Sequence, residues 1–284
     1  KLPCRPMETM REMARENRVH LVVGELEENP ELGNTYYLTL KLISTEGEIL
    51  ANYARRQPDH MELNAVLSGG KEHVLPFSNQ KGLSERELHG VVDTPFGTVG
   101  LSICSEIFVP ELLRIQMVLG AKIFLNPMNG RPMRPNIFRL KETWHAVVRA
   151  RAAENLVFVV MPDLIYERKD IGLRPEDQDA LGIIASPEGV LAMRNDVGIM
   201  YAELDMERLR FLRNRYYLKE DMETPPPADG NYTPIGCRPG QSHDRLPEIY
   251  GPLVAKQPDA FDYFYFKNGL DAWKEEFERV KKSD

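Results

Sequence analysis

One cysteine lies where a nucleophile would be placed. Cys104 comes at the end of a predicted strand and just before a predicted helix, in the stretch Gly-Leu-Ser-Ile-Cys-Ser-Glu at 100–106. A side chain on such a sharp strand-to-helix turn projects from the sheet edge, and the backbone N–H groups after it can face an anionic oxygen. A thiol here suits nucleophilic catalysis, although a lone cysteine after a β-run is more often a small buried apolar residue.

Any such thiol acts alone, because the other potential metal ligands and thiols are dispersed. The chain has 284 residues, 6 histidines and a net charge of −7. Cys4, Cys104 and Cys237 are far apart and none belongs to a Cys-x-x-Cys pair, so neither a zinc site nor a disulfide framework is predicted. The acidic balance argues against nucleic-acid binding, which needs a positive surface. We expect a small-molecule partner and no metal.

The sequence also carries no segment typical of membrane insertion or secretion. No window approaches the run of about 20 apolar residues that a membrane helix needs. The first ten residues have no apolar core of the kind that a signal peptide carries. We therefore expect a cytoplasmic protein with no membrane partner.

Short strands and helices alternate through the first two thirds of the chain and would position Cys104. The mixture of hairpins and strand–helix–strand units favours one α/β domain with layered sheets and helices. The acidic run at 25–31 is interpreted as a solvated loop. Strands are predicted at 19–24, 35–43, 48–53, 89–94, 98–104, 121–126, 156–161, 181–186, 190–194 and 199–204, and helices at 7–17, 110–119, 138–154 and 206–213.

The composition changes near residue 218. The stretch 221–240 holds three consecutive prolines and three glycines, which is typical of an extended surface segment. A strongly aromatic run at 261–266 follows. We predict a folded domain at 1–217 and a C-terminal arm at 218–284 that ends in a helix and packs across the body or a neighbouring subunit. A flexible tail is the alternative.

Five separated segments around Cys104 follow one another in the order of a known family. They are Asp93–Gly100 with Ile103–Glu106 and Pro110–Arg114, Gly120–Ala121 with Leu125–Pro127, Arg149–Asn155, Ser186–Gly189, and Leu204–Asp205 before Arg213. In these segments the chain resembles the nitrilase superfamily, the carbon–nitrogen hydrolases, over about residues 19–215, and the agreement of five segments makes the resemblance specific. It implies a four-layer α-β-β-α sandwich, no cofactor, and a homodimer or larger homo-oligomer.

The resemblance also implies a mechanism that uses a Glu, a Lys and a Cys. It makes Cys104 the nucleophile that attacks an amide or nitrile carbon, while the backbone N–H of Ser105 and a lysine stabilise the oxyanion. A glutamate acts as base toward the thiol and then toward water. The family's glutamate would precede Lys1, and neither Glu8 nor Glu25 matches it. We therefore expect a missing N-terminal edge, or else a degenerate family member.

Two positions compete for the lysine role. The stretch Tyr53–Arg56 resembles the end of the family's strand, yet it carries Arg55 where Lys is expected. The stretch Lys71–Phe77 resembles a Lys-x-His-Leu-Val-Pro-Phe stretch of the acyltransferase branch. We favour Lys71, because the planar fork of an arginine is bulkier, always protonated and unable to take part in proton transfer. An exposed loop lysine is the alternative interpretation.

Four further residues are candidates around the site. Glu106 could contact the lysine or cap the turn before the helix. Glu154 is expected to form an ion pair with Arg151, one turn away on the long helix. Asn129 follows a strand that should end near the nucleophile, so it is a candidate for substrate binding. Trp144 could also line the substrate pocket, although core packing is the commoner role of such a residue.

These features predict a thiol-dependent amidohydrolase that acts on a small linear amide or carbamoyl compound. Three alternatives stay open. A nitrilase is one, although Ser105 stands where nitrilases often have Trp. An acyltransferase is suggested by residues 71–77 and weakened by the lack of membrane segments. A catalytically inactive member that serves as a binding or scaffold protein is the third. Resemblance of fold does not identify the substrate.

Overall fold

Two β-sheets and their flanking helices make up the part of the chain that the computed structural model describes, which covers residues 6–28, 35–56, 73–74, 82–128, 141–164, 181–214 and 245–254. The first sheet has the strand order β1-β2-β3 with β4 beside β2, and the second has the order β10-β9-β8-β7-β6-β5. The strands are β1 (Leu21–Glu28), β2 (Thr35–Ile43), β3 (Ile49–Ala54), β4 (His73–Val74), β5 (Val91–Thr94), β6 (Gly97–Leu101), β7 (Ile123–Leu125), β8 (Phe158–Met161), β9 (Gly182–Ala185) and β10 (Val190–Arg194).

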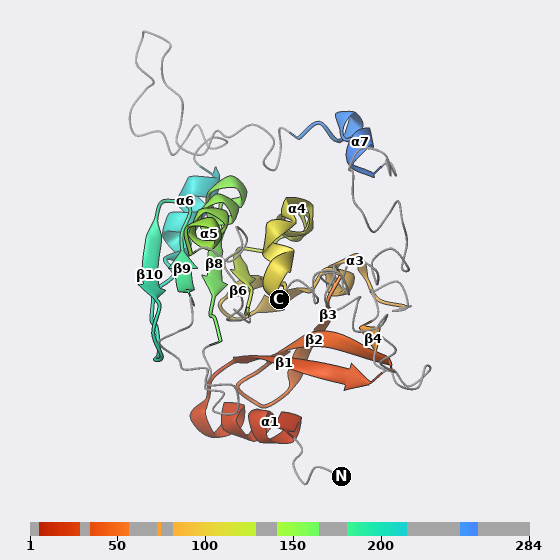
Figure 1. Ribbon diagram of the computed structural model, residues 1–284, viewed down its shortest axis with the longest axis vertical. Coiled ribbons are helices and arrows are strands. Elements are labelled where there is room, and N and C mark those ends of the chain that lie inside the picture. The colour runs from red at the N-terminus through yellow and green to blue at the C-terminus, as the bar shows by residue number, and fades with distance from the viewer. Residues whose placement is uncertain are drawn as a thin grey trace, which may run out of the picture.

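Helices form the outer layers on either side of the two sheets (Figure 1). Helix α1 (Pro6–Asn17) lies against the first sheet, and α4 (Pro110–Val118) and α5 (Lys141–Asn155) cover the second. The order of layers is therefore α-β-β-α, as the sequence predicts. The remaining helical elements are α3 (Glu85–Leu88), α6 (Met206–Asn214), α7 (Gly251–Val254) and the 3-10 helices η2 (Cys104–Phe108) and η7 (Pro247–Ile249).

Side chains of the second sheet alternate between two apolar cores. Ile123 and Phe158 face the first sheet, where they pack with Leu40 and its neighbours. Phe124 and Val159 come one residue later in each strand and face the other way, into the core beneath α4 and α5. Successive residues of a strand point to opposite faces. Continuous apolar runs such as 123–125 and 156–161 are therefore the sequence pattern of a sheet that is buried on both faces.

Replacement of Phe124 by alanine should destabilise the domain strongly. The side chain is fully buried in a central strand, and removing a buried phenyl ring loses its transfer free energy and leaves a cavity. We expect the free energy of unfolding to fall by about 3–5 kcal/mol, measured by urea denaturation. Val118→Ala on exposed α4 surface is the control and should cost less than about 0.5 kcal/mol. Equal losses in the two variants would contradict this account of the core.

One predicted strand does not form. Residues 199–204 were expected to be a strand, but they have no regular structure. Ile199 and Tyr201 are largely exposed, and of this segment Leu204 packs against the core between the sheets, so only the end of the alternating pattern meets a core. The guanidinium of Arg194 instead donates to the carbonyls of Val197 and Ile199 at 3.1 and 3.2 Å, which holds the segment in a local loop.

The prediction of a loop at 25–31 is wrong for its first four residues, which form part of a strand. Residues 25–28 belong to β1 and pair with β2. Glu25 and Glu27 form ion pairs of 2.8 and 2.7 Å with Lys41, whose side chain is nearly buried. The two carboxylates supply the counter-charge that allows a lysine to lie within a sheet, an interaction that becomes visible only when the strands are paired.

Candidate active site

A strained turn presents Cys104 at the end of β6. The residue has a φ of +53°, in the left-handed region that side chains other than glycine adopt at a cost. Its N–H donates to the carbonyl of Pro127 at 3.0 Å, and the N–H of Ser102 donates to the carbonyl of Leu125 at 3.1 Å. Since β6 and β7 are parallel, their carboxyl ends meet at one sheet edge. The half-buried thiol, which forms no disulfide, lies at this edge.

Glu106 is fully buried, and its carboxylate binds the backbone of this turn. One carboxylate oxygen accepts the N–H of Ile103 at 2.8 Å, which caps the short η2 helix. The hydroxyl of Tyr53 lies 2.9 and 3.0 Å from the two oxygens, and the backbone N–H of Arg56 donates at 2.7 Å. The capping role considered from the sequence is therefore present. The connection to Tyr53 is one that sequence reasoning missed.

Two arginines lie at the carboxyl end of β3, beside the cysteine turn. The guanidinium of Arg55 is buried, with 2% of the residue exposed, and donates to the hydroxyl of Ser105 at 2.5 Å. Arg56 packs its guanidinium 5.4 Å from the centre of the Tyr53 ring. Burial lowers the pKa of Arg56 to about 10, so the side chain stays protonated at neutral pH. Arg55 therefore places positive charge beside Ser105, the residue that follows the nucleophile, and Arg56 places it beside Tyr53.

Arg151 of α5 holds the other side of the turn. Its Nε donates to the carbonyl of Ile107 at 2.8 Å and its Nη2 to that of Phe108 at 3.4 Å. Both carbonyls lie at the end of η2, where backbone acceptors need partners. Arg151 also forms the expected ion pair with Glu154, at 2.8 Å. The pair was predicted, but its connection to the cysteine turn is visible only in the tertiary structure.

Trp144 of α5 lies next to the same turn and is largely buried, with 8% exposed. Its ring meets that of Phe108 edge to face, with centroids 4.6 Å apart. Packing of this kind supports η2 from the helical layer. A direct contact with substrate stays a prediction for Trp144.

Two predicted site residues lie outside the described residues. They are Lys71, the favoured cation, and Asn129, the candidate substrate-binding residue. The structure thus brings together Cys104, Ser105 and Glu106 in one turn. Glu154 is connected to this turn indirectly, through its ion pair with Arg151. Arg55, the competing cation, lies within this group.

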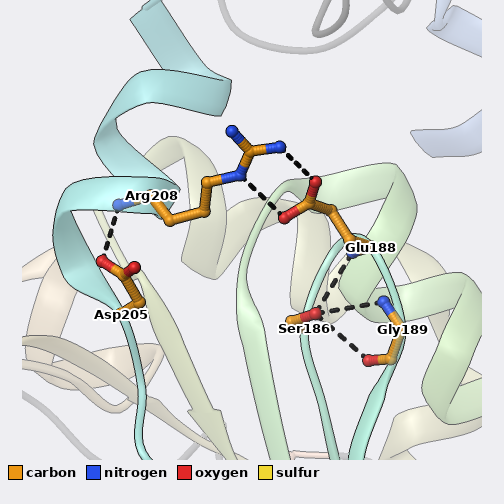
Figure 2. A network of polar contacts seen from close by, with 5 residues as sticks. All are labelled: Ser186, Glu188, Gly189, Asp205 and Arg208. Carbon is orange, nitrogen blue, oxygen red and sulfur yellow. Dashed lines mark hydrogen bonds and ion pairs between the residues drawn. The ribbon is translucent and has the colours of Figure 1, made fainter.

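A second polar cluster lies at the opposite end of the second sheet (Figure 2). Arg208 of α6 donates from two nitrogens to the carboxylate of Glu188, at 2.9 and 2.5 Å, while Asp205 accepts the backbone N–H of Arg208 at 2.8 Å. The hydroxyl of Ser186 accepts the N–H of Gly189 at 3.0 Å. This turn follows β9, which is antiparallel to β8, and so lies away from the Cys104 edge. The cluster fastens α6 to the β9–β10 hairpin.

Neither a metal centre nor a membrane span emerges from the described ranges. Within them, no group of three or more histidine, cysteine, aspartate or glutamate side chains is arranged to hold a metal ion. No helix among the same residues is both long enough and apolar enough to cross a bilayer.

Comparison with known sequences identifies relatives over most of the chain. The model of a family described as carbon-nitrogen hydrolase matches residues 2–214. Human omega-amidase NIT2 is 26% identical over 219 residues, which cover 76% of this chain and 72% of the relative. The deaminated glutathione amidase of Synechocystis is 27% identical over 191 residues, which cover 63% of this chain and 61% of that protein.

Solved structures show the same architecture. Nit3 of Saccharomyces cerevisiae, a member of the nitrilase superfamily, superposes with a TM-score of 0.58 at 21% identity, covering 79% of this chain and 73% of its own. A mutant amidase of Nesterenkonia sp. AN1 superposes with a TM-score of 0.52 at 21% identity, covering 74% and 71%. In that structure the acetamide moiety of fluoroacetamide is attached covalently to the active-site cysteine.

The four layers and the cysteine turn between them define a sandwich of the nitrilase type. The chain belongs to the carbon–nitrogen hydrolase family. It is accordingly an amidohydrolase of the class that acts on carbon–nitrogen bonds other than peptide bonds.

Proposed function

We propose that the protein hydrolyses the C–N bond of a small linear amide or carbamoyl compound through an acyl-enzyme on Cys104. The observation that carries the proposal is the position of this thiol, half-buried on a left-handed turn at a sheet edge with Arg55 next to it. Support also comes from relatives, since human NIT2 and the Synechocystis protein are amidases by name. In the mutant Nesterenkonia amidase the active-site cysteine is bonded covalently to the acetamide moiety of fluoroacetamide, which shows that this cysteine reacts as a nucleophile in that protein.

The proposed reaction has two stages. The sulfur of Cys104, after its proton passes to a general base, forms a bond to the carbonyl carbon of the amide. The C–N bond then breaks and the nitrogen leaves with a proton, as ammonia or an amine. A water molecule attacks the resulting thioester, gives up a proton to the base and releases the carboxylic acid, which restores the thiol.

The oxyanion formed at each stage needs donors. We assign the first to the backbone N–H of Ser105, because it directly follows the nucleophile at the beginning of η2. We propose Lys71 as the cation, on the resemblance of residues 71–77 to the acyltransferase branch. The described geometry favours Arg55 as a second candidate, since its guanidinium lies 2.5 Å from the hydroxyl of Ser105.

A panel of substrates distinguishes this activity from its rivals. We expect ammonia release from small linear amides, together with an increase in intact protein mass when the acyl-enzyme is trapped. Release of ammonia only from nitriles would indicate a nitrilase. Transfer of the acyl group to an added amine would indicate an acyltransferase. An unreactive thiol and no turnover of any compound would contradict the proposal and indicate a binding or scaffold protein.

The proposal extends to the whole protein. We propose that residues 1–217 form the hydrolase domain and that residues 218–284 form an arm that reinforces a homodimer or larger homo-oligomer in the cytoplasm. Light scattering on the full chain and on a chain ending at residue 217 tests the arm. A smaller mass per particle in the shortened protein is expected, whereas an unchanged number of subunits would contradict this role.

A further inference from the structure

Residues at the carboxyl end of β3 bind two neighbouring residues of the cysteine turn, Ser105 and Glu106. Arg55 donates to the hydroxyl of Ser105 at 2.5 Å. Tyr53 and the backbone N–H of Arg56 both bind the carboxylate of Glu106 at 2.7–3.0 Å. Arg55 and Arg56 thus contact Ser105 and Glu106, the two residues immediately after the nucleophile, although each pair is 50 residues apart in the sequence.

These contacts act on a residue with a strained backbone. Cys104 has a φ of +53°, a conformation that persists in non-glycine residues only where the surroundings hold it. Glu106 binds the N–H of Ile103 on one side of Cys104 at 2.8 Å. The carbonyl of Pro127 binds the N–H of Cys104 itself at 3.0 Å. Without Glu106, the turn loses the hydrogen bond that holds the N–H of Ile103.

The charges of this group require the hydroxyl of Tyr53 to remain a donor. Glu106 has no exposed surface, and a buried carboxylate is tolerated only when hydrogen bonds and a counter-charge surround it. Burial and the carboxylate of Glu106 raise the pKa of Tyr53 well above its ordinary value, so the phenol stays protonated. The guanidinium of Arg56, 5.4 Å from the phenol ring, supplies positive charge.

We propose that Tyr53 and Glu106 form a positioning pair that sets the orientation of the Cys104 thiol and keeps Arg55 beside Ser105. The pair touches neither substrate nor reacting atoms; it acts through the turn. This role rests on the proposed function and names the residues that prepare the same site for attack.

The test uses Tyr53→Phe and Glu106→Gln in the full chain. Tyr53→Phe removes one oxygen, and Glu106→Gln keeps the shape while removing the charge. Tyr201→Phe, which removes the hydroxyl of a tyrosine that is 80% exposed, is the matched control. Two rates are measured per folded molecule, with the folded fraction taken from near-ultraviolet circular dichroism. They are amide hydrolysis and the alkylation of Cys104 by iodoacetamide, followed by peptide mass spectrometry.

We expect kcat to fall about 10- to 100-fold in both variants, because a small misplacement of a nucleophile has effects of this size. KM should stay within about twofold, since the pair makes no contact with substrate. The alkylation rate of Cys104 should change in both variants and not in Tyr201→Phe. If Glu106→Gln does not fold, Tyr53→Phe carries the test.

Wild-type values of kcat and of the alkylation rate in folded Tyr53→Phe would overturn the proposal and leave the pair with a purely structural role. Failure of the proposed function gives a different result. In that case the wild-type protein releases no ammonia from any amide, while alkylation of Cys104 still reports whether the pair orients the thiol.

Discussion

Cys104→Ala should lose turnover of amides by at least about 10⁴-fold, because removal of a covalent nucleophile leaves only the binding contribution of the site. The fold should remain, since the thiol is only partly packed against the two cores and alanine fills part of its volume. Activity is measured by ammonia release and the fold by thermal unfolding.

Cys237→Ala is the control for the loss of a thiol elsewhere in the chain and should keep wild-type turnover. Intact-mass measurement adds a second readout, since the acyl adduct expected for the wild-type protein and for Cys237→Ala should be absent from Cys104→Ala. Ammonia release by Cys104→Ala at the wild-type rate would refute the assignment of the nucleophile, and with it the proposed reaction.

The second large effect concerns the cation. Lys71→Met should lower kcat by about 10²- to 10³-fold if Lys71 stabilises the oxyanion, which is the usual result when one such donor is removed. Arg55→Met should then have a smaller effect that comes from the lost contact with Ser105. The rates of both variants are compared at saturating amide, so that a change in substrate binding does not contribute.

The reverse order would assign the role to Arg55 and refute Lys71. Arg55→Lys then separates charge from shape. A lysine retains the positive charge but not the planar fork that reaches Ser105, so partial recovery relative to Arg55→Met indicates that charge at this position matters. The midpoint of thermal unfolding is measured for all three variants. A lower midpoint would show that a loss of activity comes from a destabilised fold, which is the risk when the buried side chain of Arg55 is removed.

Much of the architecture is readable from local patterns. The hairpins at 35–54 and 91–101 form where turn residues separate alternating strands, and Pro110 begins α4 as predicted. Gly120 has a φ of +106° just after that helix ends, a left-handed conformation that glycine adopts readily at the end of a helix. These signals are local because hydrogen bonds and side-chain periodicity within a few residues decide them.

The predictions that failed depend on contacts between distant segments. Residues 25–28 have the charge of a loop, but pairing with β2 and the buried Lys41 make them a strand. Residues 199–204 have the pattern of a strand, but they pair with no strand of the described ranges, and only Leu204 packs against the core between the sheets while Ile199 and Tyr201 stay exposed. In both cases a local window does not show whether a partner strand is present.

The amino-acid sequence alone determined that a strand leads to Cys104 before a helix, that the domain is a layered α/β sandwich, and that its family is the carbon–nitrogen hydrolases; the predicted strand 98–104 ends earlier, at Leu101, because Cys104 already begins η2. Only the tertiary structure decided what surrounds the thiol: Arg55 on Ser105, Tyr53 and Arg56 on Glu106, and Arg151 on the end of η2. The physical reason is range. Backbone preference and apolar periodicity act between near neighbours, whereas a buried carboxylate or guanidinium is satisfied by whichever donors or acceptors chain folding brings within about 3 Å.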